Sequence, residues 1–323
     1  MTTVAVLAGG RSPEREVSLR SGHRVASALQ SRDCDTVLID PAEGPFVENV
    51  STARVSACYV ALHGKDGEDG TVQRLLELLG IAYTGTGPRS CQLAFDKILA
   101  KETMDAHGVP TPPWTAIQAT ALRDLAAGPA LGAAVERIGL PLVVKPSRAG
   151  SAMGLSFVDH ERDLPHAVMN ALSFADAAVI ERRVDGPEVA VGMIGGTSEP
   201  LPLVEVVPKS GVFDYAARYT PGATEYFAPA RLSPDVAAAS QAAATEAFEV
   251  LGLRDVGRAD VMIDGDGRPW VIDVNVSPGM TDTSLLPMAA QAAGIGFEDL
   301  CDRVLRLALA RQPNPDPVPP KGL

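Results

Sequence analysis

The sequence predicts a mixed α/β and α+β protein, with an N-terminal doubly wound domain around a parallel sheet, a small central domain and a C-terminal domain with an antiparallel sheet. Three observations lead to this prediction. The chain has 323 residues, which exceeds the usual size of one domain. Over the first 95 residues short apolar runs alternate with helical patterns, as in parallel sheets. Beyond residue 186 strands follow one another in runs, which is typical of antiparallel sheets.

The N-terminal domain is expected over residues 1–95. Two polar, glycine-rich segments, 9–14 and 63–70, directly follow predicted strands. Ligands of parallel sheets bind at the carboxyl ends of the strands, so these segments are the first candidates for a site. The predicted strands cover 4–8, 36–39, 55–62 and 81–84, and the helices cover 17–29 and 72–79.

The central domain is expected over residues 96–185, the C-terminal domain over 186–311, and a disordered tail with five prolines over 312–323. A helix at 97–106 ends before Gly108 and Pro110. Periodicity predicts further strands at 140–145, 179–181, 188–194, 203–207, 256–263 and 269–274, and helices at 163–174 and 234–251.

Composition excludes several classes of protein. With 46% hydrophobic and 21% charged residues, the chain is neither disordered nor fibrous. Its 28 basic and 40 acidic residues give a net charge of −12, which argues against nucleic acid as the main ligand. The four cysteines lack metal-ligand spacing and no apolar run approaches the length of a membrane span, so we expect a cytoplasmic protein with no membrane partner.

Lys145 ends an apolar strand and is followed by the glycine-serine loop 150–154. A lysine beside such a loop can hold phosphate oxygens together with backbone N–H groups. A strand end followed by a turn explains this pattern equally well, because the chain contains no Walker-type spacing.

A hairpin over residues 257–279 gives a sharper signal. Its turn, 264–267, places Asp260 on one strand opposite Asp273 and Asn275 on the other. Three oxygen ligands on one face suit Mg²⁺, which keeps water and substrate phosphates in its other positions. Arg258 shares the face of Asp260 and can clamp a transferring phosphoryl group or an oxyanion. A merely solvated polar face is the less favoured alternative.

Together the motifs resemble those of the D-alanine:D-alanine ligases, of the ATP-grasp superfamily. The match is collinear from about residue 3 to 310 and includes Lys145-Pro146-Ser147-Arg148-x-Gly150-Ser151. The other matching segments are 8–18, 63–70, 83–85, 95–97, 214–219, 257–260 and 275–285. The resemblance implies an ATP-dependent ligation of two D-alanines through an acyl phosphate, for peptidoglycan precursors, by a homodimer that uses two Mg²⁺ ions, for which Mn²⁺ could substitute.

The resemblance also implies a nucleotide and metal side of the site. One group of residues would hold the phosphates, adenine and ribose of ATP: Lys97, Lys145, Ser151, Glu181 and Glu188. A second group would ligate Mg²⁺: Asp260, Asp273 and Asn275.

On the amino-acid side, the resemblance implies that Arg258 and the N–H of Gly279 stabilise the tetrahedral intermediate. Glu14 would pair with the ammonium of the first amino acid, linked to Ser151 and Tyr219 beneath a closing loop. The remaining substrate contacts would be His63, Arg218, Ser284 and Leu285.

Some of these residues have structural alternatives. His63 could equally be a structural histidine at a strand end. For Glu68 and Asp69 we favour a turn or helix cap over catalysis.

Several departures from the family pattern bear on the substrate. The family has glutamate where Asp273 stands, and we expect the neighbourhood to have repacked so that a glutamate no longer fits. It has lysine at Arg218, whose forked guanidinium faces the second substrate. The other departures are Ala149, Ala152, Arg74 and Val276. A same-fold ligase that joins or cyclises other amino acids, and a non-catalytic ATP-binding relative, therefore remain alternatives. The missing GxGxxG pattern excludes a nicotinamide dehydrogenase.

Overall fold

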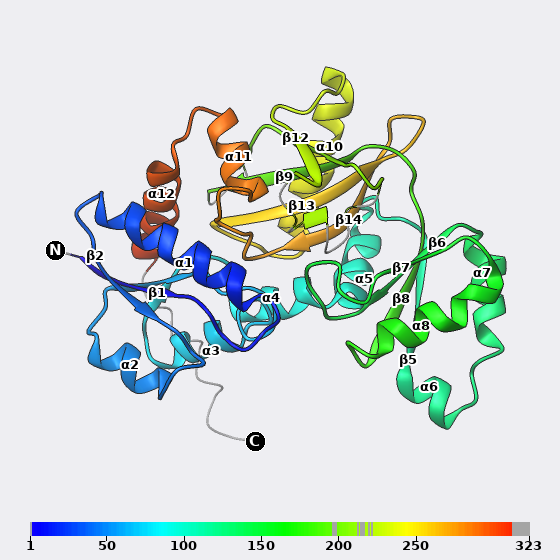
Figure 1. The fold of residues 1–323 in the computed structure, drawn as a ribbon, viewed down its shortest axis with the longest axis horizontal. Helices are drawn as coiled ribbons and strands as arrows, with labels where there is room; N and C mark the ends of the chain where they lie inside the picture. Colours follow the sequence, from blue (N-terminus) through cyan, green and yellow to red (C-terminus); the bar gives the residue numbers. More distant parts are fainter. Residues whose placement is uncertain are drawn as a thin grey trace.

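The computed structural model describes residues 2–195, 199–211, 213, 217–218, 220 and 222–311. Three sheets, each with its own helices, lie in a row: the first sheet at one end, the sheet of β9 to β14 in the middle and the sheet of β5 to β8 at the other end (Figure 1). The predicted tail, 312–323, lies outside the described residues. No described helix combines the length and apolarity needed to cross a bilayer.

The first sheet is parallel, in the order β2-β1-β3-β4, as the sequence predicts. Strands β1 and β3 are almost wholly buried because helices cover both faces of the sheet. Its elements are β1 (Thr3–Leu7), α1 (Arg15–Gln30), β2 (Asp35–Ile39), α2 (Phe46–Thr52), β3 (Ala57–Val60), α3 (Thr71–Leu78), β4 (Ala82–Tyr83) and α4 (Pro88–Phe95).

The sheet of the central region is antiparallel, in the order β5-β8-β6-β7. Helices α6, α7 and α8 pack on the strands of this sheet and form its hydrophobic core, so the other face of the sheet is free of these helices. The elements are α5 (Lys97–His107), β5 (Trp114–Gln118), α6 (Ala119–Asp124), α7 (Ala130–Ile138), β6 (Leu142–Pro146), β7 (Ser156–Val158), the 3-10 helix η1 (Glu161–Asp163), α8 (Leu164–Leu172) and β8 (Ala177–Arg182).

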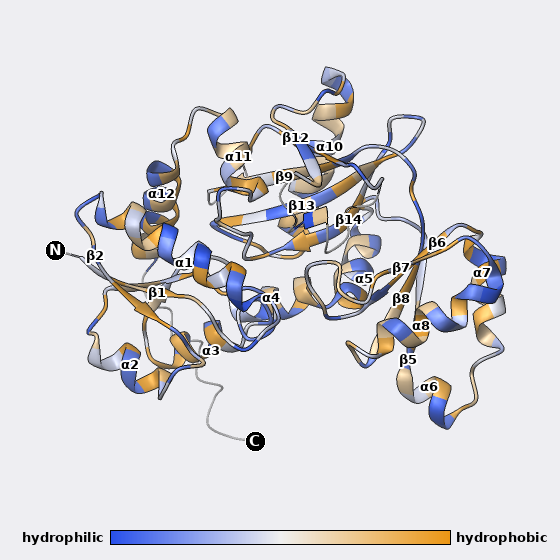
Figure 2. Ribbon diagram, in the orientation of Figure 1, coloured by the Kyte–Doolittle hydropathy of each residue, from blue (hydrophilic) through white to orange (hydrophobic). Residues whose placement is uncertain are grey.

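The remaining sheet is also antiparallel, in the order β12-β11-β9-β13-β14, with β10 paired to β9. Figure 2 shows the apolar residues concentrated along its strands. Its elements are β9 (Glu188–Ile194), β10 (Glu199–Pro200), β11 (Val204–Pro208), β12 (Thr224–Phe227), α10 (Pro234–Val250), β13 (Val256–Ile263), β14 (Pro269–Asn275), α11 (Leu285–Ala292) and α12 (Phe297–Ala310).

Helix α12 leaves the third part of the chain and packs on the first sheet, against α1, β3 and β4 (Figure 1). Its buried residues Leu300, Val304 and Leu305 share one core with Val4 and Tyr59. The sequence analysis named no helix in this segment. The two ends of the chain therefore build one hydrophobic core.

A polar clamp also joins the first sheet to the last one. The buried carboxylate of Asp255 accepts a hydrogen bond from Gly85 N (2.8 Å) and pairs with Arg311. Arg254 donates to Gly85 O (3.0 Å) and to the hydroxyl of Tyr83 (3.1 Å). These contacts fix the end of β4 to the loop before β13.

Candidate active site

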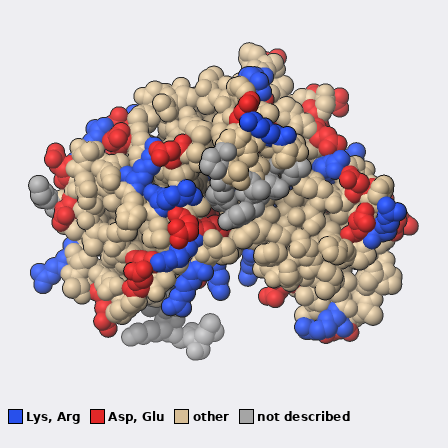
Figure 3. Space-filling view, viewed as in Figure 1, with Lys and Arg blue, Asp and Glu red and all other residues tan. Residues whose placement is uncertain are grey.

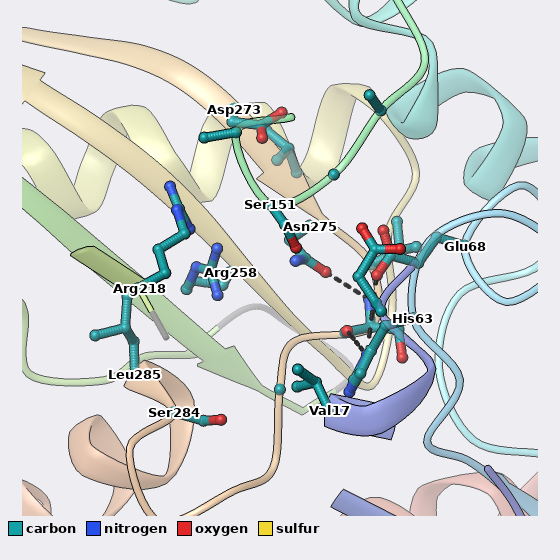
Figure 4. A pocket seen from close by; sticks show the side chains of 18 of the residues that line it. Val17, His63, Glu68, Ser151, Arg218, Arg258, Asp273, Asn275, Ser284 and Leu285 are labelled. Carbon is teal, nitrogen blue, oxygen red and sulfur yellow. Dashed lines mark hydrogen bonds and ion pairs between the residues drawn. The ribbon is translucent and has the colours of Figure 1, made fainter. Parts of the chain in front are cut away.

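One cleft collects side chains from all three parts of the chain (Figure 4). It encloses about 1100 Å³ of empty space, part of it open to solvent. Eleven of the residues expected to bind ligands or to catalyse line it: Glu14, His63, Lys97, Ser151, Arg218, Arg258, Asp273, Asn275, Gly279, Ser284 and Leu285. On the face that Figure 3 shows, the described acidic and basic side chains are interspersed and form no continuous basic surface.

A second hollow adjoins the cleft and shares Lys97, Arg218 and Asp273 with it. Lys145 and Asp260 line this hollow, together with the apolar side chains of Met153, Leu155 and Ile272. Glu181 and Glu188 line neither cavity, and Tyr219 lies outside the described residues.

Glu14 precedes α1 and is buried, with only 6% of its surface exposed. A Cβ on Gly64 would lie 2.5 Å from its Oε2, and one on Gly150 would lie 2.7 Å from its Oε1, so a side chain at either position would displace the carboxylate. Oε1 has no hydrogen-bond partner among the described residues. A buried carboxylate oxygen in this state favours a cationic ligand.

His63 is buried at the start of the loop after β3. Its Nδ1 lies 3.0 Å from the carbonyl oxygen of Ser277, and its Nε2 lies 3.1 Å from Ser21 Oγ. Burial lowers the pKa of His63 to about 4, and the charge of Arg258 adds to the effect, against the Ser277 hydrogen bond. The ring is therefore neutral at physiological pH.

Glu68 also lines the cleft, with 12% of its side chain exposed. Burial raises its pKa to about 8; the charges of Glu14 and Asp273 add to the effect, while a Gly64 hydrogen bond and Lys97 oppose it. Asp69, by contrast, accepts a hydrogen bond from Thr71 N (3.0 Å) at the start of α3. The sequence analysis favoured a local role for both residues and missed the place of Glu68 in the cleft.

In the hairpin of β13 and β14 Asp260 pairs with Asp273, as expected, through a register shift between Asp260 and Val261, whereas Asn275 pairs with Arg258. Arg258 donates two hydrogen bonds to the carboxylate of Asp260, at 2.6 and 2.9 Å. Burial lowers the pKa of the guanidinium, but Asp260 outweighs it and raises that pKa above its usual value. The carboxylate thus fixes a permanent positive charge in the cleft.

Asp273 faces the open cleft, with 37% of its side chain exposed. Lys97 Nζ lies 3.1 Å from its Oδ1 and 3.1 Å from the carbonyl oxygen of Ala149. Burial opposes ionisation of Asp273, but the charges of Lys97 and Lys145 prevail and lower its pKa. The Cα pairing of Asp260 with Asp273, and Asn275 two residues further on, gives a set of oxygen donors suited to Mg²⁺.

Lys145 and Lys101 both pair with Glu181, which is buried at the end of β8. Lys145 also donates to the carbonyl oxygen of Ile272 (3.3 Å). Burial opposes ionisation of Glu181, but the two lysines outweigh it and lower the pKa of the carboxyl. The sequence analysis missed Lys101, although it lies four residues after Lys97 on the same helix face.

Glu188 begins β9, beside Met262 of β13. Burial raises its pKa to about 7, against the attraction of Arg218. Arg218 itself stacks on Phe213, with its Cζ 4.1 Å from the ring centroid.

The loop before α11 carries the last group of residues. Ser284 Oγ accepts a hydrogen bond from Thr281 N (3.0 Å), and a Cβ on Gly279 would lie 2.6 Å from that oxygen. Ser284 is the N-cap residue of α11 and Leu285 is its first helical residue, so the N-terminus of this helix lies at the cleft.

The structure shows the surroundings of two residues that depart from the family pattern, Arg74 and Ala152. Arg74 pairs with Glu77 on α3 (3.2 Å) and does not line the cleft. Ala152, which lines it, and Ser151 both have positive φ angles, +55° and +54°, a strained backbone for residues other than glycine.

Comparison with known proteins agrees with this geometry. Residues 103–306 match the family described as D-ala D-ala ligase C-terminus, and residues 40–86 match D-ala D-ala ligase N-terminus. A D-alanine–D-alanine ligase of Desulforamulus reducens is 40% identical over 307 residues, which cover 95% of this chain and 98% of the relative.

Two solved structures have a TM-score of 0.82 with this chain. One is the D-alanine–D-alanine ligase of Bacillus anthracis complexed with ATP, 28% identical, with 96% of this chain and 98% of that chain covered. The other is the VanG D-Ala:D-Ser ligase of Enterococcus faecalis, which is 26% identical. The match covers 95% of this chain and 99% of that chain. The chain belongs to the D-alanine–D-alanine ligase family.

Proposed function

We propose that this protein joins two D-alanines to D-alanyl-D-alanine at the expense of ATP, for peptidoglycan precursor synthesis. The observation that carries the proposal is that three groups meet in one cleft. They are the carboxylate oxygen of Glu14 that has no hydrogen-bond partner in the described part of the chain, the cation of Arg258, and the Lys97–Asp273 pair. These groups suit an ammonium, an oxyanion and a phosphate respectively.

ATP would bind in the hollow beside the cleft. Lys97 and Lys145 line this hollow and would hold the phosphates, and Ser151 would assist from the glycine-serine loop. The family resemblance assigns adenine and ribose to the segments of Glu181 and Glu188, which line neither cavity, so these contacts would form beyond the hollow. Transfer of the γ-phosphoryl group to the first carboxylate needs mainly positioning and charge neutralisation, which these cations supply.

Mg²⁺ fits the oxygen donors Asp260, Asp273 and Asn275, which would hold it. When bound, the metal neutralises phosphate charge. Arg258 and Lys97 now pair with two of these carboxylates, so they would turn toward the phosphates as the ligands bind. We include a second ion, and Mn²⁺ as a substitute, in this proposal.

The amino acids would occupy the cleft proper. Glu14 would accept the first ammonium, with Ser151 and Tyr219 beside it and His63 nearby. The second amine then attacks the acyl phosphate, and Arg258 with the N–H of Gly279 stabilises the oxyanion until phosphate leaves. Ser284 and the N–H of Leu285 would receive the second carboxylate, with Arg218 facing it.

The proposal includes a cytoplasmic homodimer whose chain divides into domains at residues 1–95, 96–185 and 186–311. These assignments rest on the family resemblance and on the order of the elements in the sequence.

A second candidate is ligation to a different acceptor amino acid. Arg218, which stands where the family pattern has lysine, favours it, because a stacked guanidinium presents a different set of donors to the acceptor carboxylate. A relative of similar structure carries the name D-Ala:D-Ser ligase.

An ADP-release assay across a panel of D- and L-amino acids tests both candidates. We expect ADP release that requires Mg²⁺ and D-alanine, with D-alanyl-D-alanine identified by mass spectrometry. Robust turnover only with another acceptor would replace the first candidate by the second. Nucleotide binding without any turnover would indicate a non-catalytic relative.

A further inference from the structure

Lys101 is a buried lysine that the proposed reaction does not use. It lies on α5 between Lys97 and Asp105, at a spacing of four residues, so the three share one face of the helix. Only 2% of its surface is exposed. Burying an ammonium to this degree is costly unless every donor finds a partner, so this lysine needs a specific reason to be there.

The partners of Lys101 are fixed at short distances. Its Nζ lies 2.8 Å from Glu181 Oε2 and donates to Thr111 Oγ1 at 2.6 Å. It lines neither the cleft nor the adjoining hollow, so it touches no ligand there and acts through Glu181.

Glu181 therefore divides its single negative charge between two cations. Its other oxygen pairs with Lys145, whose side chain lines the hollow beside Asp260 and Asp273. If Lys101 were absent, Lys145 would be the ion-pair partner left to Glu181 among the described residues. The attraction between two buried opposite charges is strong, so Lys145 would be neutralised and held at the base of the site.

We propose that Lys101 is a positioning residue that neutralises Glu181, so that the charge of Lys145 remains available to the polyphosphate of a nucleotide. The inference rests on the proposed ATP-dependent function and deepens it. With Lys101 present the cluster of Lys101, Lys145 and Glu181 has a net charge of +1; without it the cluster is neutral.

The electrostatics of the cluster are consistent with this division of charge. Burial lowers the pKa of Lys101, and Lys145 adds to the effect while Glu181 opposes it. For Lys145, burial acts in the same direction, but Glu181 and Asp273 prevail and raise the pKa. Lys145 thus stays cationic where it faces the hollow.

Titration calorimetry of Lys101→Met with Mg·ADP and with adenosine tests the inference. The substitution keeps an unbranched side chain, one atom shorter, and removes its charge. We expect ADP affinity to fall at least tenfold while adenosine affinity changes less than twofold, because adenosine carries no phosphate. Equal losses for both ligands, or an unchanged ADP affinity, would overturn the inference. Thr111→Val is the matched control, because it keeps the charges of Lys101, Lys145 and Glu181. It should reduce the ratio of ADP affinity to adenosine affinity far less than Lys101→Met does.

Glu181→Gln is a second test, in which the expected change has the opposite sign. It does not require that Lys101→Met folds. Removing the carboxylate frees Lys145, so the ratio of ADP to adenosine affinity should rise above that of the wild type. In this background Lys101→Met should no longer lower the ratio. A ratio that falls in Glu181→Gln would refute the charge-sharing argument. Wild-type protein that binds neither ligand would refute the proposed function, an outcome distinct from any change confined to the variants.

Discussion

His63 donates a hydrogen bond from Nδ1 to the carbonyl oxygen of Ser277, 3.0 Å away and 214 positions later in the chain. A carbonyl oxygen only accepts, so Nδ1 carries the proton and Nε2 of the neutral ring accepts from Ser21. Ser21 Oγ in turn accepts from Met280 N (3.1 Å). The ring therefore fastens the loop that carries Gly279 to the first sheet, which is a structural role next to the expected contact with substrate.

The neutral state of His63 predicts a loss of stability in acid. Its folded-state pKa of about 4 lies below the usual 6.5, so its contribution is complete above pH 6.5 and disappears as the pH falls to about 4. We expect the wild type to lose about 3 kcal/mol more unfolding free energy than His63→Gln across this window, as measured by urea denaturation. His166→Gln, an exposed histidine on α8, is the control. Parallel curves for wild type and His63→Gln would contradict this account.

The buried carboxyl of Glu68 predicts the opposite dependence of stability on pH. Its carboxyl has a folded-state pKa of about 8, so the stability that its neutral form provides is complete below about pH 4.5 and is lost as the pH rises to 8. Glu68→Gln should remove that loss and unfold at higher urea than the wild type at pH 8, by up to about 4 kcal/mol. Glu48→Gln, on the exposed surface of α2, should show no such gain. An identical shift in both variants would exclude the buried carboxyl as its origin.

Arg258→Ala should reduce turnover by roughly 10²- to 10³-fold, the effect of removing one oxyanion donor, while the KM for ATP changes little. Arg258→Lys keeps the charge but loses the bidentate contact with Asp260, so it should recover only part of the rate. Steady-state kinetics at saturating D-alanine measures both. A large rise in KM for ATP with kcat intact would assign Arg258 to nucleotide binding instead.

Asp273→Glu tests the proposed metal site. The sequence alone favours a repacked neighbourhood that rejects the longer side chain, but Asp273 is 37% exposed and faces the open cleft. The extra methylene therefore has room, and we expect turnover to hold or rise at limiting Mg²⁺. A titration of activity against Mg²⁺ for both proteins measures this. A fall in turnover would restore the repacking argument, and superimposable curves would show that position 273 does not ligate the metal.

Most of the fold and many residues of the cleft could be predicted from the sequence. The physical reason differs from element to element. The hairpin of β13 and β14 was predictable from its short turn, but the turn alone would place Asp260 opposite Ile272. A register shift between Asp260 and Val261, which no local pattern announces, pairs Asp260 with Asp273 instead. The parallel first sheet followed from the alternation of strands and helices.

Other features depend on contacts that no local pattern contains. Glu68 looked like a turn residue because its place in the cleft, near the charges of Glu14 and Asp273, depends on residues distant in sequence. Lys101 could have been noticed from its helical spacing with Lys97, but its partner Glu181 lies 80 residues further on. The sequence analysis named no helix at α12, and no local pattern could have shown that this helix packs on the first sheet.

The packing of α12 has a consequence for synthesis on the ribosome. Val4 and Tyr59 leave the exit tunnel long before Leu300, Val304 and Leu305, which complete their core. Until then the nascent first sheet exposes an apolar face, and loops that close over such long separations form slowly. The first sheet therefore cannot complete its hydrophobic core before α12 has left the exit tunnel.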